Sequence, residues 1–260
     1  MATNMRSRML PVAALAIALG VTQFAPNSMA ENTQNDSQIQ AQLTKSLSNK
    51  HFKDVRVSVQ DGVVSLAGTV DVYGVKADAE KKAHKLKNVS AVRDDIQVGG
   101  PEIADQVLQD KLIRRIQTDR VGYGTTAFNA ISVNVENGVA YLGGLACRPM
   151  DKEYALGDAS YMPGVKNVVD NIQVAPLSMM DDRVRFDTAR AVYGYPTLLK
   201  YAVDPVKPIR ILVENGNVTL VGTVQSQMDK NVAGIRANGV FGAFKVTNDL
   251  QVANQQTERN

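Results

Sequence analysis

Side chains suited to catalysis or metal binding are scarce in this chain of 260 residues, which has two histidines and a single cysteine. A zinc site usually needs three or four Cys, His or carboxylate ligands at suitable spacing, and His51, His84 and Cys147 do not supply such a set. Gly-x-Ser-x-Gly, Ser-x-x-Lys with its partners and a phosphate-binding loop are absent. The sequence therefore predicts that the protein is not an enzyme and that it uses no cofactor and no metal.

Two pairs of adjacent acids, Asp94-Asp95 and Asp181-Asp182, are the other candidates for acid–base chemistry. Neighbouring residues on a strand point to opposite faces of the sheet, so Asp94 and Asp95 should not share a proton. We interpret all four as solvated surface or turn acids. Cys147 has no second cysteine to pair with, which excludes an intrachain disulfide, and we expect a small, buried or half-buried residue there.

Lysines offer the first candidate for binding. The stretch VKADAEKKAHKLKN carries Lys81, Lys82, Lys85 and Lys87 on or beside one expected helix. Each lysine near an anionic membrane contributes about 1 kcal/mol, so a group of four would matter. An ordinary solvated helix face is the competing interpretation, with Asp78 and Glu80 nearby offsetting part of the charge.

Aromatic residues offer the second candidate, in two long connections interrupted by glycine and proline. Such residues often contact a partner or a membrane interface, but they can equally pack over their own small core. The sequence leaves both interpretations open for Tyr123 and Phe128 in the first connection and for Tyr193, Tyr195 and Tyr201 in the second.

The N-terminus predicts export. Arg6 and Arg8 precede an apolar run, Pro11–Val21, that is too short for a membrane-spanning helix, and Ser28-Met29-Ala30 resembles a signal-peptidase site. We expect cleavage after Ala30 and a periplasmic mature protein without a transmembrane segment. That mature chain has 27 Lys and Arg against 26 Asp and Glu, a balance that does not suggest a nucleic-acid-binding protein.

An internal repeat organises the rest. QDGVVSLAGTV, ENGVAYLGGLA and ENGNVTLVGTV recur at steps of 76 and 78 residues, and VRDDIQV, VVDNIQV and VTNDLQV recur in the same phase. We interpret each unit as a helix, two strands joined at Asp-Gly or Asn-Gly, a second helix and a last strand. In the first unit, Asp36 or Ser37 is expected to cap the first helix. The prediction is an α+β fold of three tandem two-layer αββαβ sandwiches.

Six glycines recur with the units. Gly62, Gly138 and Gly216 are expected at positive φ in hairpin turns, where residues with a Cβ are disfavoured. The second glycine of each pair is expected to let the chain leave the sheet or to let a helix pack closely. These second glycines are Gly68, Gly144 and Gly222.

This pattern of helix, V-x-V-x-V, N/D-G, V-x-L-x-G-x-V, helix and V-x-[ND]-[ND]-[IL]-Q-V resembles the BON domain (bacterial OsmY and nodulation), in three copies. The second copy departs from it at Gly144–Cys147 and at Pro149, so its second helix is expected to start late or to sit differently. The resemblance implies an OsmY-like periplasmic or envelope protein, with roles in osmotic stress and envelope integrity. It also implies binding to phospholipid or envelope proteins, and no catalysis.

The domain boundaries expected from these patterns are a signal peptide at 1–30, a flexible N-terminus at 31–36, BON-like domains at 37–100, 103–176 and 181–253, and a flexible tail at 254–260. The leading hypothesis is a stress-related, non-catalytic envelope protein that binds anionic phospholipid or envelope proteins, with no nucleic acid. The alternative is a periplasmic chaperone-like or scaffold protein that binds client polypeptides along its sheet edges.

Overall fold

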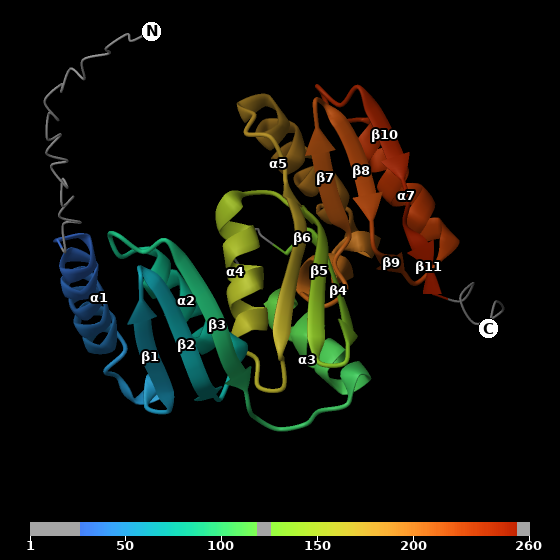
Figure 1. Ribbon diagram of the computed structural model, residues 1–260. Helices are drawn as coiled ribbons and strands as arrows, with labels where there is room; N and C mark the ends of the chain where they lie inside the picture. Colours follow the sequence, from blue (N-terminus) through green and yellow to red (C-terminus); the bar gives the residue numbers. More distant parts are fainter. Residues whose placement is uncertain (1–26, 119–125, 254–260) are drawn as a thin grey trace, which may run out of the picture.

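The computed structural model describes residues 27–118 and 126–253, with residues 27–32 described by their backbone alone. Over these residues the chain forms the same helix–strand–strand–helix–strand unit three times (Figure 1). Each unit has a small sheet with helices packed against it, and each helix–sheet pair encloses apolar side chains. The three-copy α+β fold predicted from the sequence is therefore confirmed.

The first unit has its central strand between an antiparallel and a parallel neighbour. Its helices α1 and α2 bury Leu43, Ala79 and Ala83 against Leu66 and Ile96 of the sheet. The elements are α1 (Asn27–Ser46), the 3-10 helix η1 (Lys50–Phe52), β1 (Val55–Gln60), β2 (Val63–Val70), α2 (Tyr73–His84) and β3 (Ala91–Val98).

The second unit repeats this topology, in the order β4-β5-β6. The expectation that Pro149 delays its second helix is wrong, because Pro149 occupies the first turn of α4, where its missing N–H costs no hydrogen bond. The elements are α3 (Asp105–Thr118), β4 (Ala130–Glu136), β5 (Val139–Ala146), α4 (Pro149–Ser160) and β6 (Asn167–Val174).

The third unit is larger, because two short helices separate its first long helix from its first strand. Two of its strands are also divided: β8 stops before Gly222 and resumes as β9, and β10 resumes as β11. The elements are α5 (Met179–Tyr193), η2 (Pro196–Leu198), α6 (Lys200–Val203), β7 (Arg210–Glu214), β8 (Asn217–Val221), β9 (Thr223–Val224), α7 (Gln227–Asn238), β10 (Lys245–Asn248) and β11 (Gln251–Val252).

An aspartate in the first helix of each unit binds the hairpin turn of the same unit. The carboxylate of Asp36 accepts hydrogen bonds from the backbone N–H groups of Asp61 (2.7 Å) and Gly62 (2.8 Å). The predicted cap is therefore wrong: Asp36 and Ser37 lie inside α1, and Asp36 reaches a turn 25 residues away. Asp105 and Asp181 make the same paired contacts with Asn137-Gly138 and Asn215-Gly216.

Both glycines of each pair have positive φ, for different reasons. Gly62, Gly138 and Gly216 lie in the hairpin turns, at φ of 74°, 76° and 74°. Gly68 lies within β2 rather than at its end, and a Cβ there would overlap the carbonyl oxygen of Asp54, next to the start of β1. A Cβ at Gly144 or at Gly222 would likewise collide with a backbone carbonyl oxygen, that of Ala130 or that of Pro208. Close approach of two strand backbones, not helix packing, requires the second glycine.

The units are in contact and their orientation alternates. In Figure 1 the β1–β2 and β7–β8 hairpins point to the upper side of the view, whereas the β4–β5 hairpin points to the lower side. The first and second units meet where Tyr161, after α4, contacts Gly74 and Asp78 of α2. The second and third units share a core, because Phe128 and Cys147 are buried among side chains of the third unit.

Candidate binding surfaces

The predicted lysine group lies at the C-terminal end of α2 and in the turn that follows it. Lys81 and Lys82 are in the helix, Lys85 is its C-terminal cap, and Lys87 is in the turn before β3. Lys81, Lys85 and Lys87 are exposed. Lys82 is half-buried, with its ammonium nitrogen 5.9 Å from the centre of the Phe52 ring. We call this group the lysine turn.

The two carboxylates on the same helix as the lysine turn, Asp78 and Glu80, contact other groups. Asp78 is engaged elsewhere, because it accepts a hydrogen bond of 2.6 Å from the hydroxyl of Tyr161 in the second unit. Glu80 lies 3.8 Å from the ring of His84. Within the part of the chain that the structure describes, no salt bridge joins a carboxylate to any of the four lysines. The four ammonium groups are therefore not held in ion pairs among the described residues and can meet an external anion.

The equivalent turns of the other two units are not basic. A repeat step of 76 residues separates the first and second units, and a step of 78 residues separates the second and third. In the second unit, the positions equivalent to the four lysines hold Gly157, Asp158, Tyr161 and Pro163. In the third unit the residues are Ile235, Arg236, Gly239 and Phe241. Only one of these eight residues is basic, so the lysine turn is a property of the first unit and not of the repeated fold.

The other lysine of this helix, Lys76, has a structural role. Its ammonium donates a hydrogen bond of 2.7 Å to the carbonyl of Ile96 and lies 3.8 Å from the carboxylate of Asp94. Asp94 is thus not the solvated acid that we expected, whereas Asp95 is exposed on the opposite face of the sheet. The second unit repeats the pair as Lys152 and Asp170, 2.7 Å apart.

Two of the aromatic candidates are held within the third unit. Tyr193 hydrogen-bonds through its hydroxyl to the carbonyl of Ile209, and burial raises the pKa of that hydroxyl. Tyr201 is 4% exposed; its hydroxyl donates to Asp229 (2.8 Å) and accepts from the backbone N–H of Gln225 (2.7 Å). The contacts of Tyr201 fasten α6 to the start of α7, and neither hydroxyl is available to a partner.

The remaining aromatic candidates differ in exposure. Tyr195 is 37% exposed and lies with its ring centre 5.7 Å from the guanidinium of Arg236. Phe128 is buried between the second and third units, where its ring meets that of Phe186 edge-on at 5.2 Å. Tyr123 lies outside the described residues.

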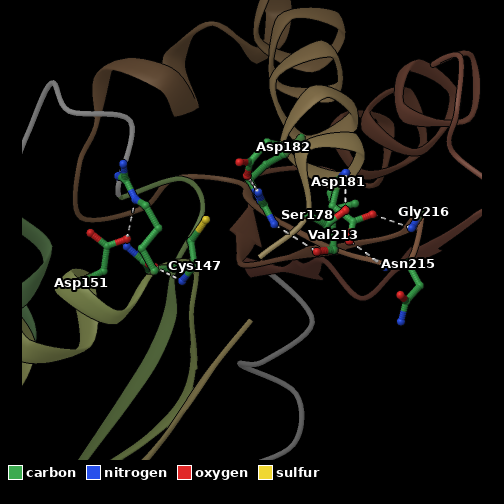
Figure 2. A network of polar contacts seen from close by, with 11 residues as sticks. Cys147, Asp151, Ser178, Asp181, Asp182, Val213, Asn215 and Gly216 are labelled. Carbon is green, nitrogen blue, oxygen red and sulfur yellow. Dashed lines mark hydrogen bonds and ion pairs between the residues drawn. The ribbon is translucent and has the colours of Figure 1, made fainter. Parts of the chain in front are cut away.

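A polar network borders the junction between the second and third units (Figure 2). Asp181 is buried, not solvated, and points to the backbone of Asn215 and Gly216. Beside it, the buried guanidinium of Arg185 binds Asp182 and donates a hydrogen bond of 3.1 Å to the carbonyl of Val213.

On the other side of this junction, the backbone N–H of Cys147 donates a hydrogen bond of 2.6 Å to the side chain of Asn129. Cys147 is buried, as expected, and burial raises the pKa of its thiol. This residue therefore contributes packing and not a reactive thiolate.

The backbone joins these two units as well. The N–H of Ile211 in β7 donates to the carbonyl of Ala127 at 2.7 Å, and Arg210 donates to the carbonyls of Thr126 and Asn129. Ala127 thus pairs with the outer edge of β7, which lies at the margin of its sheet. The segment that precedes β4 therefore protects one edge of the third sheet.

Neither a metal site nor a membrane span is found in the residues that the structure describes. No group of three or more His, Cys, Asp or Glu side chains there could hold a metal ion. No helix among them is long and apolar enough to cross a bilayer. The apolar run at Pro11–Val21 lies outside these residues.

The family model described as "BON domain" matches three segments of the chain, residues 34–100, 104–176 and 197–254. Together these segments cover well over half of the 260 residues. The chain belongs to the BON domain family. This finding confirms the resemblance drawn from the repeated hairpin and closing-strand motifs.

The third BON domain is larger than its matched segment. The match begins at residue 197, beyond α5, but Asp181 of α5 binds the Asn215-Gly216 turn just as Asp36 and Asp105 bind theirs. Since α5 also packs against β7 and α7, it is the first helix of this domain. The residues between α5 and β7, with their two short helices, are an insertion within the BON pattern.

Other similar proteins include the "Uncharacterized protein in gshII 5'region" of Anaplasma centrale, which is 26% identical over 125 residues. That alignment covers 47% of this chain and 83% of the relative. Two solved structures of CdsD, a structural protein of the type III secretion system of Chlamydia trachomatis, are also similar. They have TM-scores of 0.23 and 0.22 at 14% and 15% identity, covering 83% and 87% of this chain and 96% and 95% of theirs.

Proposed function

We propose that this protein is a non-catalytic binding protein of the bacterial envelope, and that its first BON domain binds anionic phospholipid through the lysine turn. The observation that carries the proposal is the cluster of Lys81, Lys85 and Lys87, exposed and without a salt bridge among the described residues. A periplasmic location, reached by cleavage after Ala30, and a role under osmotic stress belong to the same proposal.

Phospholipid fits this surface better than a compact anion does. The lysines lie at a helix end and in the turn after it, and three of them are exposed, so their ammonium groups can meet several headgroups at once. Lys81 and Lys85 are one helical turn apart and share a face. At about 1 kcal/mol for each lysine near an anionic membrane, Lys81, Lys82 and Lys85 together contribute roughly 3 kcal/mol.

The test is binding of residues 31–260 to sedimented vesicles of phosphatidylcholine, with and without phosphatidylglycerol, at two salt concentrations. We expect binding that needs phosphatidylglycerol and that weakens at high salt, because salt screens exposed charges. Changing Lys81, Lys82 and Lys85 to glutamine should weaken binding on the order of a hundredfold. Glutamine leaves helix propensity nearly unchanged, so the fold should persist.

A matched control removes three positive charges from the second domain. Lys111, Arg114 and Lys166 are exposed, and their change to glutamine should leave binding within about twofold of the parent. Equal losses in both triple variants would show that total charge, and not the lysine turn, governs binding. A parent protein that binds no vesicles would refute the lipid proposal and favour the client-binding alternative, which capture of an unfolded polypeptide would then test.

A further inference from the structure

The turn that carries lysines in the first domain carries exposed phenylalanines in the third. The first and third copies are 154 residues apart, so Phe241 corresponds to Lys87 and Phe244 corresponds to Ser90. Phe241 is 92% exposed and Phe244 is 83% exposed, although both belong to a turn between α7 and β10. Burying a phenylalanine is normally worth roughly 1.5–3 kcal/mol, so leaving two in water calls for an explanation.

The turn holds these rings in place. Phe244 donates its backbone N–H to the carbonyl of Gly216 at 2.8 Å, and its ring covers that glycine so closely that a Cβ there would lie 2.5 Å from it. Next to Phe241, Gly242 has a φ of 89° and lies against Val184 of α5. The rings are therefore presented by a fixed backbone.

Further apolar side chains lie at the same end of the domain. Asp181 binds the Asn215-Gly216 turn, which places the first residues of α5 beside it. Two of these residues, Met179 and Met180, are 90% and 66% exposed. We call Met179, Met180, Phe241 and Phe244 the apolar tip.

Charges around the apolar tip nearly balance. Asp182 is paired with the buried Arg185, and Arg183 lies 3.8 Å from Asp187. Lys245 and Glu214 are exposed and opposite in sign. Nothing in this balance repels either a neutral or an anionic membrane, and an apolar contact of this kind is insensitive to the screening of charge by salt.

We infer that the apolar tip inserts into the outer part of a phospholipid bilayer, while the lysine turn of the first domain meets the headgroups. This inference rests on the proposed function. A bilayer is the occupant that fits, because the four apolar side chains of the tip are exposed at one end of the third domain and the lysine turn lies on the same side (Figure 1). The lysine turn lies beside the β1–β2 hairpin, since Ser90, just after it, donates its N–H to the carbonyl of Gly62 at 2.9 Å. Figure 1 shows the hairpin ends of the first and third domains on that side and the hairpin end of the second on the other.

The experiment uses tryptophan as a depth probe, since the chain has none of its own. Phe241→Trp in residues 31–260 should shift its emission to the blue on phosphatidylglycerol-containing vesicles and be quenched by brominated acyl chains. Met228→Trp is the matched control, because Met228 is 71% exposed at the opposite end of α7. It should show neither change.

A second measurement tests how much the Phe241 ring contributes to vesicle binding. Phe241→Ser should weaken vesicle binding about tenfold, at low and at high salt alike, while Met228→Ser should not. Hydrogen exchange of the third domain should be unchanged in Phe241→Ser, because that ring is almost fully exposed.

The outcomes separate this inference from the proposed function. If the Phe241→Trp variant binds vesicles and its emission is neither shifted nor quenched, insertion is overturned and the lysine turn stands. If that emission is quenched and the triple glutamine variant binds as the parent does, the apolar tip is supported and the lysine turn is refuted. A parent protein that binds no vesicles would overturn both.

Discussion

The hydroxyl of Tyr161 in the second BON domain lies 2.6 Å from the carboxylate of Asp78 in the first, and it donates a hydrogen bond across the junction. The tyrosine ring packs so closely on α2 that a Cβ at Gly74 would lie 2.8 Å from it. This contact orients one domain against the other, and it engages the Asp78 carboxylate with the second domain instead of with the lysine turn.

The junction should respond to alkaline pH. The hydrogen bond to Asp78, followed by burial, raises the pKa of Tyr161 to about 12. Because the folded pKa is raised, the contact is fully present below the ordinary tyrosine pKa of about 10 and is lost as the pH rises through about 12. Titration of the Tyr161 ring carbon by NMR should show that midpoint, and Asp78→Asn should lower it. An unchanged midpoint in Asp78→Asn would contradict the assignment.

Removing the aspartate that binds the third hairpin should destabilise the third domain. Asp181→Ala leaves the N–H groups of Asn215 and Gly216 without their acceptor, and we expect a loss of roughly 3 kcal/mol. Hydrogen exchange of peptides from this domain would measure the loss without interference from the other two. Asp249→Ala is the control: this exposed acid should be worth less than about 0.5 kcal/mol.

Alanine should have opposite effects at two glycines. Gly68→Ala forces a Cβ onto the carbonyl oxygen of Asp54 at a φ of 132°, so we expect more than about 2 kcal/mol of destabilisation. Gly157 lies inside α4 with no atom within 4 Å of its Cβ position, so alanine there should stabilise by up to about 1 kcal/mol. Thermal unfolding of the two variants tests both signs.

Valine at Gly216 should also destabilise the third domain, by about 1 kcal/mol or more. Two causes combine, since φ is 74° and the ring of Phe244 occupies the space of the new side chain. Adding Phe244→Ser should recover part of the loss, because only the steric cause is removed. Thermal unfolding measures both effects, and an unchanged melting curve for Gly216→Val would contradict the turn assignment.

Acid should loosen the insertion of the third domain. Burial raises the pKa of Asp229, but hydrogen bonds from Lys200, Tyr201 and Ser226 outweigh burial and lower it overall. A lowered pKa means that this stabilisation is present above the ordinary aspartate pKa of about 4 and is lost as the pH falls through the folded value. In Asp229→Asn, hydrogen exchange of residues 195–208 should be faster at neutral pH and should depend less on acid than in the parent.

The repeated pattern was enough to predict the fold because its signals are local. Asp-Gly and Asn-Gly between alternating strands specify hairpins, and the four-residue spacing of Ile39, Leu43 and Leu47 specifies a helix face. The contacts that were missed join residues distant in sequence. Asp36 lies 25 residues from the turn that it binds, and Tyr201 lies 28 residues from Asp229.

Part of the missed information was nevertheless present in the sequence. An aspartate recurs in the first helical segment of every copy, at Asp36, Asp105 and Asp181, and this recurrence was the signal for the turn-binding residue. The sequence shows that Phe241 and Phe244 stand where the first copy has Lys87 and Ser90, but this is seen only when the three copies are aligned. The exposure of Phe241 and Phe244 could not be predicted, because in a sequence an exposed phenylalanine looks the same as a buried one.

The turn between the second helix and the last strand carries lysines in one copy, packs Tyr161 against a neighbour in the next, and presents phenylalanines in the last. The three copies share one frame of helices and strands and differ in this loop. A consensus sequence of the three copies is therefore expected to give a stable BON domain but to lack the features that distinguish this protein. Averaging would preserve the glycines and aspartates that the copies share and would erase the differences by which each copy is distinguished.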